Sequence, residues 1–323
     1  RDNSMKSMII KKFGGPDVFE AQEVGQPEIR PNDVLVKVHA TSVNPVDLSV
    51  REAGEWAGVA PPAIIGYDVS GVVEDVGSAV EEFAVGDEVF YTPEISERQG
   101  SYAEYHTAHE QIVAHKPVNL SHEEAASLPL VGATAFQSLI LRAKLQVGET
   151  VLIHGAGGVG SAAIQIAKAA GAYVLATCSD YMVETAEALG ADRAINYKSG
   201  EFVKIVNEET DNFGVDIVFD TVGGDLLTRS IDVTKPFGRM VGIVSTDTGF
   251  SAAFRKNITV HPLFLQRDRY KLKALRDMIE REQLKPVIDT IMPLEKVAEA
   301  HRRLAEGGVK GKLVLDVAAQ AAQ

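Results

Sequence analysis

The clearest pattern of apolar and polar positions lies between residues 149 and 171. Residues 151–153 form an apolar run short enough for one buried strand. A glycine-rich segment follows, and from Ser161 the apolar residues recur at helical spacing, with Ile164 and Ile166 available for packing. This pattern predicts a strand, a tight turn and a helix that packs on a sheet.

Apolar strands alternate with helices in the residues that follow. A helix is predicted at 182–190, closed by Gly190, and further strands are predicted at 173–178, 193–197, 215–220, 239–244 and 258–264. Strands that are apolar throughout and separated by helices are typical of a parallel sheet covered on both faces. We therefore predict an α/β fold with a doubly wound sheet.

The first 120 residues have a different pattern. Alternating strands are predicted at 33–43, 70–77 and 87–92, with glycine and proline between them. Many short strands without helices indicate a small barrel-like domain. The start, RDNSMKSM, has no apolar signal core, and we expect it to be a frayed or added end without a role in function.

The composition changes after Pro117. Ser121 is a predicted helix N-cap, and Glu124 completes a capping box, so the domain boundary is placed here. The predicted domains are 1–120 (catalytic), 121–264 (dinucleotide-binding) and 265–323 (shared). The last of these holds helices at 270–282 and 294–308 and a strand at 311–317, which we expect to return to the first domain.

Three glycines after the first apolar run give the pattern GxGxxG. Gly155 permits a tight turn out of the strand, Gly157 permits close approach of a pyrophosphate, and Gly160 permits close helix packing. The phosphates would then meet the free N–H groups of the helix N-terminus. The pattern favours a dinucleotide site, and the alternative is a tight turn that binds nothing.

Length, charge and cysteine content narrow the class of protein. A chain of 323 residues favours two domains, and a net charge of −13 argues against nucleic acid or an anionic membrane as partner. The single cysteine, Cys178, excludes an internal disulfide framework and fits a reducing, cytoplasmic location. No apolar run approaches the ~20 residues of a membrane span.

The ends of the predicted strands carry candidate cofactor contacts. No acid occupies the end of strand 173–178, near Thr177, which leaves room for the 2′-phosphate of NADPH, while Asp180 just beyond favours neither cofactor. Four residues follow other strand ends on the ligand side and are expected near the nicotinamide: Val222, Gly223, Ser245 and Phe264. Phe264 reads equally well as a core aromatic residue.

Several segments, taken in order, resemble one family. They are ATSVNPVDL (40–48), GYDVSGVVEDVG (66–77), GDEVF (86–90), SYAEY (101–105), AASLPLVGATAF (125–136), HGAGGVG (154–160), LGADRAINY (189–197) and GKLVL (311–315). The chain resembles the medium-chain dehydrogenase/reductase superfamily, and within it the zinc-free quinone oxidoreductases of the zeta-crystallin-like branch. The resemblance implies a GroES-like β-barrel, a Rossmann domain, a cleft between them, NADPH-dependent reduction and a homodimer paired through the strand at 258–264.

The resemblance also assigns individual residues. Asn44, Tyr67 and, approximately, Leu130 match the positions of zinc ligands in the zinc-dependent relatives, and none is a good ligand, so no metal is expected. Cofactor contacts are implied for the turn that includes Gly158 and Val159. Ser179 and Tyr197 match contacts of the 2′-phosphate, and Lys312 matches a position near the cofactor. Met182 stands where the family usually has a lysine.

Catalysis by a nucleophile has no candidate, because no Gly-x-Ser-x-Gly elbow or CxxC occurs. We therefore predict direct hydride transfer to a quinone. Asn44 is the candidate to hydrogen-bond the substrate carbonyl or the cofactor amide, and Tyr67 is the candidate proton donor. Two alternatives stay open: an enone or acryloyl-type reductase, and a non-catalytic NADPH-binding protein, which Ser49 favours because relatives often have tyrosine there.

Overall fold

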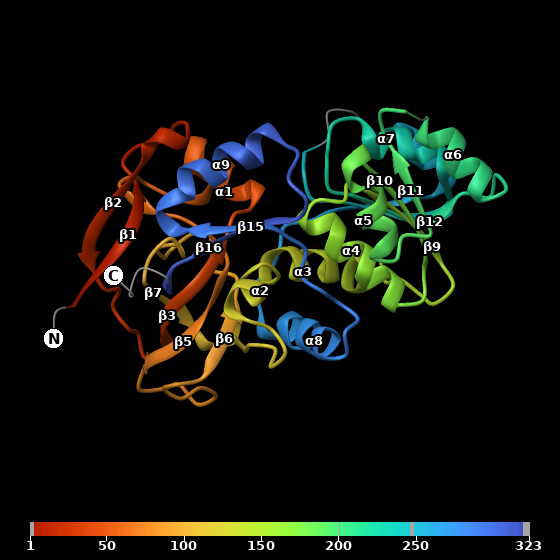
Figure 1. Cartoon of the computed structure of the whole chain (residues 1–323). Helices are drawn as coiled ribbons and strands as arrows, with labels where there is room; N and C mark the ends of the chain where they lie inside the picture. The colour runs from red at the N-terminus through yellow and green to blue at the C-terminus, as the bar shows by residue number, and fades with distance from the viewer. Residues whose placement is uncertain (1–2, 200, 246–248, 319–323) are drawn as a thin grey trace. The chain divides into compact units, whose positions relative to one another are not determined.

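The computed structural model describes residues 3–199, 201–245 and 249–318, and these residues form two compact units. Unit 1 contains residues 1–130, 267–280 and 286–323. Unit 2 contains residues 131–266 and 281–285. The chain therefore returns to unit 1 at residue 267, passes through unit 2 once more at residues 281–285, and ends in unit 1. In Figure 1 the blue C-terminal strands β15 (Ile288–Pro293) and β16 (Lys312–Asp316) accordingly lie beside the orange strand β3 (Asp33–Ser42).

Unit 1 is built on two β-sheets. The smaller has the order β2–β1–β4, and the larger has the order β15–β16–β3–β5–β6–β8, with β7 also paired to β3. Their strands are β1 (Ser4–Ile10), β2 (Phe19–Gly25), β3 (Asp33–Ser42), β4 (Ala63–Ile64), β5 (Val69–Val76), β6 (Glu88–Tyr91), β7 (Tyr105–His109), β8 (Ala114–His115), β15 (Ile288–Pro293) and β16 (Lys312–Asp316). The predicted first domain with many short strands is confirmed.

The C-terminal part of the chain completes the larger sheet. Strand β16 pairs antiparallel with β3, with Val314 opposite Ser42, and β15 pairs parallel with β16. The α-helices among the described residues of this unit are α1 (Pro45–Ala53), α2 (His122–Ala126), α8 (Arg269–Glu280) and α9 (Val297–Glu306). Helix α2 begins as predicted, because the Ser121 hydroxyl accepts a hydrogen bond from the Glu124 N–H at 3.1 Å.

Two expectations for the N-terminal part are wrong. Helix α1 interrupts a region predicted to contain strands alone. The N-terminal segment, expected to be frayed or added, forms β1 from Ser4 onward, and residues 4–7 pair with residues 22–25 of β2. This part of the first segment is held by a full antiparallel ladder and is part of the fold.

Unit 2 contains a six-stranded sheet with the order β11–β10–β9–β12–β13–β14, and each neighbouring pair is parallel. The strands are β9 (Thr150–His154), β10 (Tyr173–Cys178), β11 (Arg193–Asn196), β12 (Val215–Asp220), β13 (Thr234–Gly242) and β14 (Thr259–Pro262). Counted along the chain, this order is 3-2-1-4-5-6, which confirms the predicted doubly wound dinucleotide fold.

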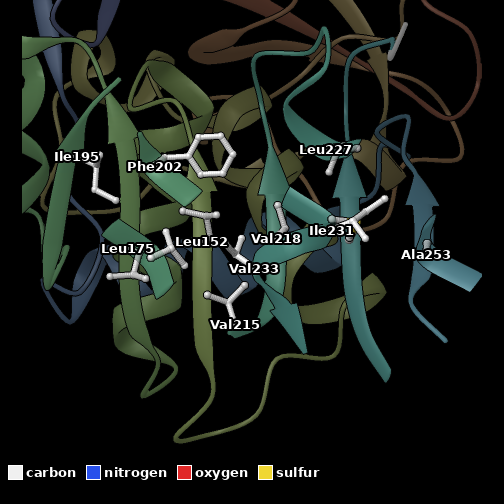
Figure 2. Close-up of a cluster of buried hydrophobic side chains, with 12 residues drawn as sticks. Leu152, Leu175, Ile195, Phe202, Val215, Val218, Leu227, Ile231, Val233 and Ala253 are labelled. Carbon is white, nitrogen blue, oxygen red and sulfur yellow. The ribbon is translucent and has the colours of Figure 1, made fainter. Parts of the chain in front are cut away.

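Helices follow the strands of this sheet in the expected alternation. They are α4 (Gly158–Ala169), α5 (Val183–Ala188), α6 (Phe202–Glu209) and α7 (Leu226–Ser230), which follow β9, β10, β11 and β12. Helix α3 (Pro129–Phe136) and a π-helical turn over Gln137–Arg142 come before β9. Leu152, Leu175 and Val218 project from neighbouring strands into one apolar cluster, where Phe202 and Leu227 cover them (Figure 2). Because successive strand residues alternate between faces, the sheet is apolar on both sides.

No helix within the described residues is long and apolar enough to cross a membrane. The predicted domain limits, 1–120, 121–264 and 265–323, stay an interpretation of the sequence. The compact units change at Leu130 and again around residues 266 and 280–286.

Candidate functional site

The glycine-rich turn lies at the point of the unit 2 sheet where the strand order reverses, between β9 and β12. In open α/β sheets, ligands bind at the carboxyl ends of the strands at this point. The end of β9 leads into Gly155, whose φ of +92° is a left-handed conformation that favours glycine. A Cβ atom at Gly155 would lie 2.5 Å from Thr221 Oγ1, so this turn requires glycine on two counts.

The other two glycines of the pattern differ in what surrounds them. A Cβ atom at Gly160 would lie 1.9 Å from the Gly155 carbonyl oxygen, so Gly160 is needed for the packing of α4 on the turn. A Cβ atom at Gly157 would meet nothing within 4 Å. Gly157 is exposed and stands at the N-cap of α4, where the first N–H groups of the helix have no partner within the helix. Gly158 and Val159 are the first residues of that helix.

The glycine-rich turn and the N-terminus of α4 together form a cradle that fits the pyrophosphate of a dinucleotide. Helix α4 is twelve residues long, and its positive end lies where the backbone can be approached closely. The turn is held from the neighbouring strand, because the Thr221 hydroxyl donates to the His154 carbonyl oxygen at 2.6 Å. The opening above Gly157 is the observation that favours a ligand over an empty tight turn.

The segment after β12 is fixed by a buried carboxylate. Asp220 accepts hydrogen bonds from the N–H groups of Val222 at 2.8 Å and Gly223 at 3.0 Å. Gly223 has a φ of +96°, and a Cβ atom there would lie 2.9 Å from Val244. Val222 is left 58% exposed at the carboxyl end of the sheet. This geometry places the Val222–Gly223 segment where the sequence predicts the nicotinamide to lie.

Ser245 and Phe264 also follow strands of unit 2, β13 and β14. Ser245 is exposed, and Phe264 is 64% exposed, so the interpretation of Phe264 as a core aromatic residue is wrong. An exposed aromatic side chain after the last strand of the sheet is compatible with a ligand contact. The contact itself stays a prediction.

At the opposite side of the switch point, β10 ends beside β11. The Tyr197 N–H donates to the Cys178 carbonyl oxygen at 3.1 Å, so Tyr197 lies close to Ser179. Tyr197 is 56% exposed and Ser179 is partly exposed, whereas Met182 is only 3% exposed. The side chain at position 182 therefore points into the unit 2 interior, and a lysine introduced there would bury its charge.

Cys178 is buried, and burial raises the pKa of its thiol to about 11. A thiol that stays protonated at neutral pH is a poor nucleophile. His154 is also buried, between Thr177 Oγ1 at 2.9 Å and Ser230 Oγ at 2.7 Å, and burial lowers the pKa of His154 to about 3. It is a neutral structural histidine that links β9, β10 and α7.

Asn44, a candidate catalytic residue of unit 1, belongs to a buried polar cluster. Asn44 Nδ2 donates to Asp68 Oδ2 at 2.8 Å, and Ser42 Oγ donates to the same oxygen at 2.7 Å. The Lys312 ammonium donates to Asn44 Oδ1 and, at 2.9 Å, to the Val43 carbonyl oxygen, and it lies 3.5 Å from Asp68. Burial raises the pKa of Asp68 and lowers that of Lys312, and their ion pair opposes both shifts.

These contacts give Lys312 a definite role within unit 1. Its ammonium fixes which way the Asn44 amide faces, with the oxygen toward Lys312 and the nitrogen toward Asp68. Asn44 is fully buried, and its side-chain oxygen and nitrogen form hydrogen bonds within this cluster. Contact of Lys312 with the cofactor, and of Asn44 with a substrate, stay predictions.

A second buried arrangement begins at Asp47, three residues after Asn44. The Tyr102 hydroxyl donates to Asp47 Oδ2 at 2.5 Å and lies 3.0 Å from His301 Nε2. Arg51 Nη1 lies 2.8 Å from His301 Nδ1. Arginine can only donate, so Nδ1 accepts and Nε2 carries the hydrogen that is donated to Tyr102. The donors therefore point in one direction, from Arg51 through His301 and Tyr102 to Asp47.

This chain of hydrogen bonds ends on a half-satisfied carboxylate. Asp47 Oδ2 also accepts from the Asn44 N–H at 3.1 Å, but Asp47 Oδ1 has no hydrogen-bond partner among the described residues. Burial raises the pKa of Asp47 to about 7, against the hydrogen bonds from Tyr102 and Asn44. Burial also lowers the pKa of His301 to about 3, so this imidazole is neutral at neutral pH.

Tyr67 is 1% exposed, and burial raises the pKa of its phenol, which stays protonated at neutral pH. Asp47 and Arg267 are the charged groups that act on it. Arg267 is a residue that sequence reasoning missed. Its Nε donates to the Pro93 carbonyl oxygen at 3.1 Å, across 174 positions of sequence that no local pattern connects. Tyr67 as a proton donor stays a prediction.

Comparison with known proteins identifies the family. Residues 30–118 match the family described as "Alcohol dehydrogenase GroES-like domain", and residues 189–315 match "Zinc-binding dehydrogenase". An NADPH-dependent alkenal/one oxidoreductase of Arabidopsis thaliana is 36% identical, over 96% of this chain and 79% of that protein. The chain belongs to the medium-chain dehydrogenase/reductase superfamily.

Other members of the superfamily are similar over nearly the whole length. A quinone oxidoreductase of Homo sapiens is 32% identical over 96% of this chain and 97% of that protein. The structure of a quinone oxidoreductase from Coxiella burnetii superimposes with a TM-score of 0.89 at 36% identity, and covers 97% of this chain and 99% of that chain. The predicted resemblance is confirmed.

The name of the second matched family raises the question of metal. Within residues 3–199, 201–245 and 249–318, no group of three or more histidine, cysteine, aspartate or glutamate side chains is arranged to hold a metal ion. Asn44 and Tyr67 occupy two of the positions where zinc-dependent relatives are expected to have ligands. Metal content stays a prediction that is tested below.

Proposed function

We propose that this protein is an NADPH-dependent reductase of quinones that transfers hydride directly, without zinc. The observation that carries the proposal is the open space above Gly157, at the N-terminus of α4 and at the switch point of the unit 2 sheet. Superfamily membership supports a nicotinamide cofactor, and the names of the relatives support a reductase.

The overall reaction takes one hydride from NADPH and one proton from solvent or protein, and converts a quinone to a hydroquinone with release of NADP⁺. The cofactor supplies the hydride, so the protein must bind and orient. Gly155, Gly157 and Gly160 shape the pyrophosphate cradle with Gly158 and Val159. Val222, Gly223, Ser245 and Phe264 are proposed for the nicotinamide end, and Ser179 and Tyr197 for the 2′-phosphate.

Direct transfer is supported by the state of the only thiol. Cys178 is buried with a raised pKa, and so offers no nucleophile for a covalent intermediate. Asn44 and Tyr67 are proposed to act on the substrate carbonyl from unit 1. Lys312 and Asp68 hold the Asn44 amide in one orientation.

A second candidate substrate class is α,β-unsaturated carbonyl compounds. The observation that favours it is the identity of 36% to an alkenal/one oxidoreductase, against 32% to a quinone oxidoreductase over the same share of this chain. Both reactions use the same cofactor and the same hydride donor. They differ in the shape of the substrate and in the atom that accepts the hydride.

One assay separates the candidates. NADPH oxidation is followed with 1,4-benzoquinone, 1,4-naphthoquinone, a short enone and a 2-alkenal, each over a range of concentrations. A kcat/KM at least tenfold higher for the quinones supports the first candidate, and the reverse order supports the second. No turnover with either class, together with tight NADPH binding, would leave a binding protein and refute both.

The proposal also includes a homodimer. The β14 strand is at the edge of the unit 2 sheet and half-exposed, and a two-fold related copy pairing there would give a homodimer. Sedimentation that gives a monomer at micromolar concentration would contradict the homodimer.

A further inference from the structure

The segment after β10 offers no positively charged side chain to bind the 2′-phosphate of the proposed cofactor. Met182 holds the place of the expected lysine after β10, and its buried side chain cannot be replaced by a charged one without cost. The exposed ionisable groups that follow β10 directly, Asp180 and Glu184, are acidic and would repel a phosphate. NADPH binding therefore needs a positive charge from another element.

Lys198 lies directly after the end of β11 and meets this need. Its ammonium stands 5.8 Å from the centre of the Tyr197 ring, and both side chains are exposed. Strand β11 pairs with β10 so that Asn196 lies opposite Cys178, and Lys198 is therefore beside the end of β10. The Lys198 N–H donates to Asn196 Oδ1 at 3.0 Å, which fixes the backbone of this turn.

The ammonium of Lys198 forms no ion pair with a carboxylate of the described residues. Among the described residues, no aspartate or glutamate lies within 4.0 Å of its ammonium. Other cations of these elements are engaged: Lys168 with Asp192, Arg193 with Glu209, and Lys204 with Glu208. Lys198 is thus a cation held over an aromatic ring at the strand ends where the adenosine ribose of a dinucleotide would lie.

We propose that Lys198 supplies the cation that recognises the 2′-phosphate, and that Tyr197 holds it in place. This inference rests on the proposed NADPH function. The positive charge is then supplied by the turn after β11 and not by the helix after β10. A chain with methionine at position 182 can therefore still favour NADPH. Tyr197 contributes a ring face to the lysine and a hydroxyl to the phosphate.

The test measures binding and needs no turnover. Isothermal titration compares adenosine 2′,5′-bisphosphate with adenosine 5′-monophosphate for the wild-type protein, Lys198→Met, Lys198→Arg and the control Lys204→Met. Lys204 is an exposed lysine on α6 of the same unit. We expect Lys198→Met to weaken the bisphosphate about five- to tenfold and the monophosphate hardly at all. Lys198→Arg and Lys204→Met should leave both affinities nearly unchanged.

The outcomes separate this inference from the function on which it rests. Wild-type preference for the bisphosphate that persists in Lys198→Met would overturn the role of Lys198 and leave NADPH specificity intact. No wild-type preference would overturn NADPH specificity and the inference with it. A preference that falls in Lys198→Met and becomes less sensitive to salt supports both, because the lost contact is ionic.

Discussion

Asp47→Asn tests the buried hydrogen-bond chain of unit 1. In the wild-type protein the Asp47 carboxylate accepts from Tyr102 and from the Asn44 N–H through one oxygen, and the other oxygen has no partner among the described residues. Asparagine keeps the accepting oxygen and removes the charge. The substitution therefore removes the cost of an ionised, half-satisfied group in the interior.

The expected effect on stability depends on pH, and its sign follows from the pKa. Burial raises the pKa of Asp47 from 3.8 to about 7 in the folded protein. Between these values the folded state binds a proton that the unfolded state has lost, so the free energy of unfolding falls as pH rises. At 1.36 kcal/mol for each pH unit, the interval corresponds to a loss of about 4 kcal/mol. Relative to wild type, Asp47→Asn should gain that amount between pH 4 and pH 7 and nothing more above it.

The difference between variant and wild type is the informative quantity. His106, His154 and His301 are buried, and burial lowers the pKa of His106 to about 4 and the pKa of His154 and of His301 to about 3. Each of these histidines therefore makes the folded protein less stable as pH falls below 6.5. The contributions of these histidines to the free energy of unfolding change with pH in the opposite direction to that of Asp47. The contributions of His106 and His154, which lie outside the hydrogen-bond chain of Asp47, largely cancel when the free energies of the two proteins are subtracted at each pH.

Urea unfolding from pH 4 to pH 8, followed by tryptophan fluorescence, measures this difference. The only tryptophan, Trp56, lies in the same unit as Asp47. Asp33→Asn is the matched control: burial, which raises the pKa of Asp33, is outweighed by hydrogen bonds from Arg98 and from the Arg30 N–H, so its pKa is lowered. Its contribution is lost only below about pH 4. A constant difference for Asp47→Asn across the range would refute the assignment of a raised pKa.

Three further substitutions and one metal analysis address the candidate site. Gly160→Ala should destabilise unit 2 by about 1–3 kcal/mol in thermal or urea unfolding, because its Cβ would meet the Gly155 carbonyl oxygen. Gly157→Val should change stability by no more than about 1 kcal/mol but abolish NADPH binding in titration, and binding that survives would count against the pyrophosphate cradle. Cys178→Ser should retain turnover and a deuterium isotope effect from C4-labelled NADPH, and loss of turnover with intact binding would speak against direct hydride transfer. Elemental analysis should find no stoichiometric zinc, whereas about one zinc per chain, removed by a chelator with loss of activity, would overturn the zinc-free proposal.

The fold of unit 2 was predictable because its signals are local. The apolar runs at 173–178 and 215–220 coincide with β10 and β12, since strands covered on both faces tolerate few polar residues. The glycine turn was equally clear, because the requirement for glycine at Gly155 and Gly160 arises from atoms within a few residues or on the adjacent strand. Met182 shows the limit of this reasoning, since its identity was visible in the sequence and its burial was not.

Helix α1 was missed for a physical reason. Val46, Leu48 and Val50 alternate with polar residues, which is the pattern of a strand, and they follow directly after β3. The residues that α1 buries have helical spacing instead, but they are Asp47, Val50 and Arg51. Two of the three are ionisable, so a reading based on apolar positions assigns the wrong period to this segment.

The polar interior of unit 1 could not be predicted from the sequence, because its partners lie far apart along the chain. Arg51 and His301 are 250 positions apart, and Asn44 and Lys312 are 268 apart. No spacing rule connects such pairs. They meet because β16 pairs with β3 and because α9 belongs to the same unit. The C-terminal segment therefore contributes the partners that allow α1 to bury its charges.

Asn44 joins the two buried arrangements, and this decides how its substitution must be interpreted. Its backbone N–H serves Asp47, and its side chain serves Asp68 and Lys312. Asn44→Ala leaves the Lys312 ammonium and the Asp68 carboxylate each without one partner, a loss that is costly for buried charged groups. Lost activity in that variant is therefore equally expected of a residue that only positions others. A role on the substrate requires that kcat falls while NADPH binding and the urea midpoint stay at their wild-type values.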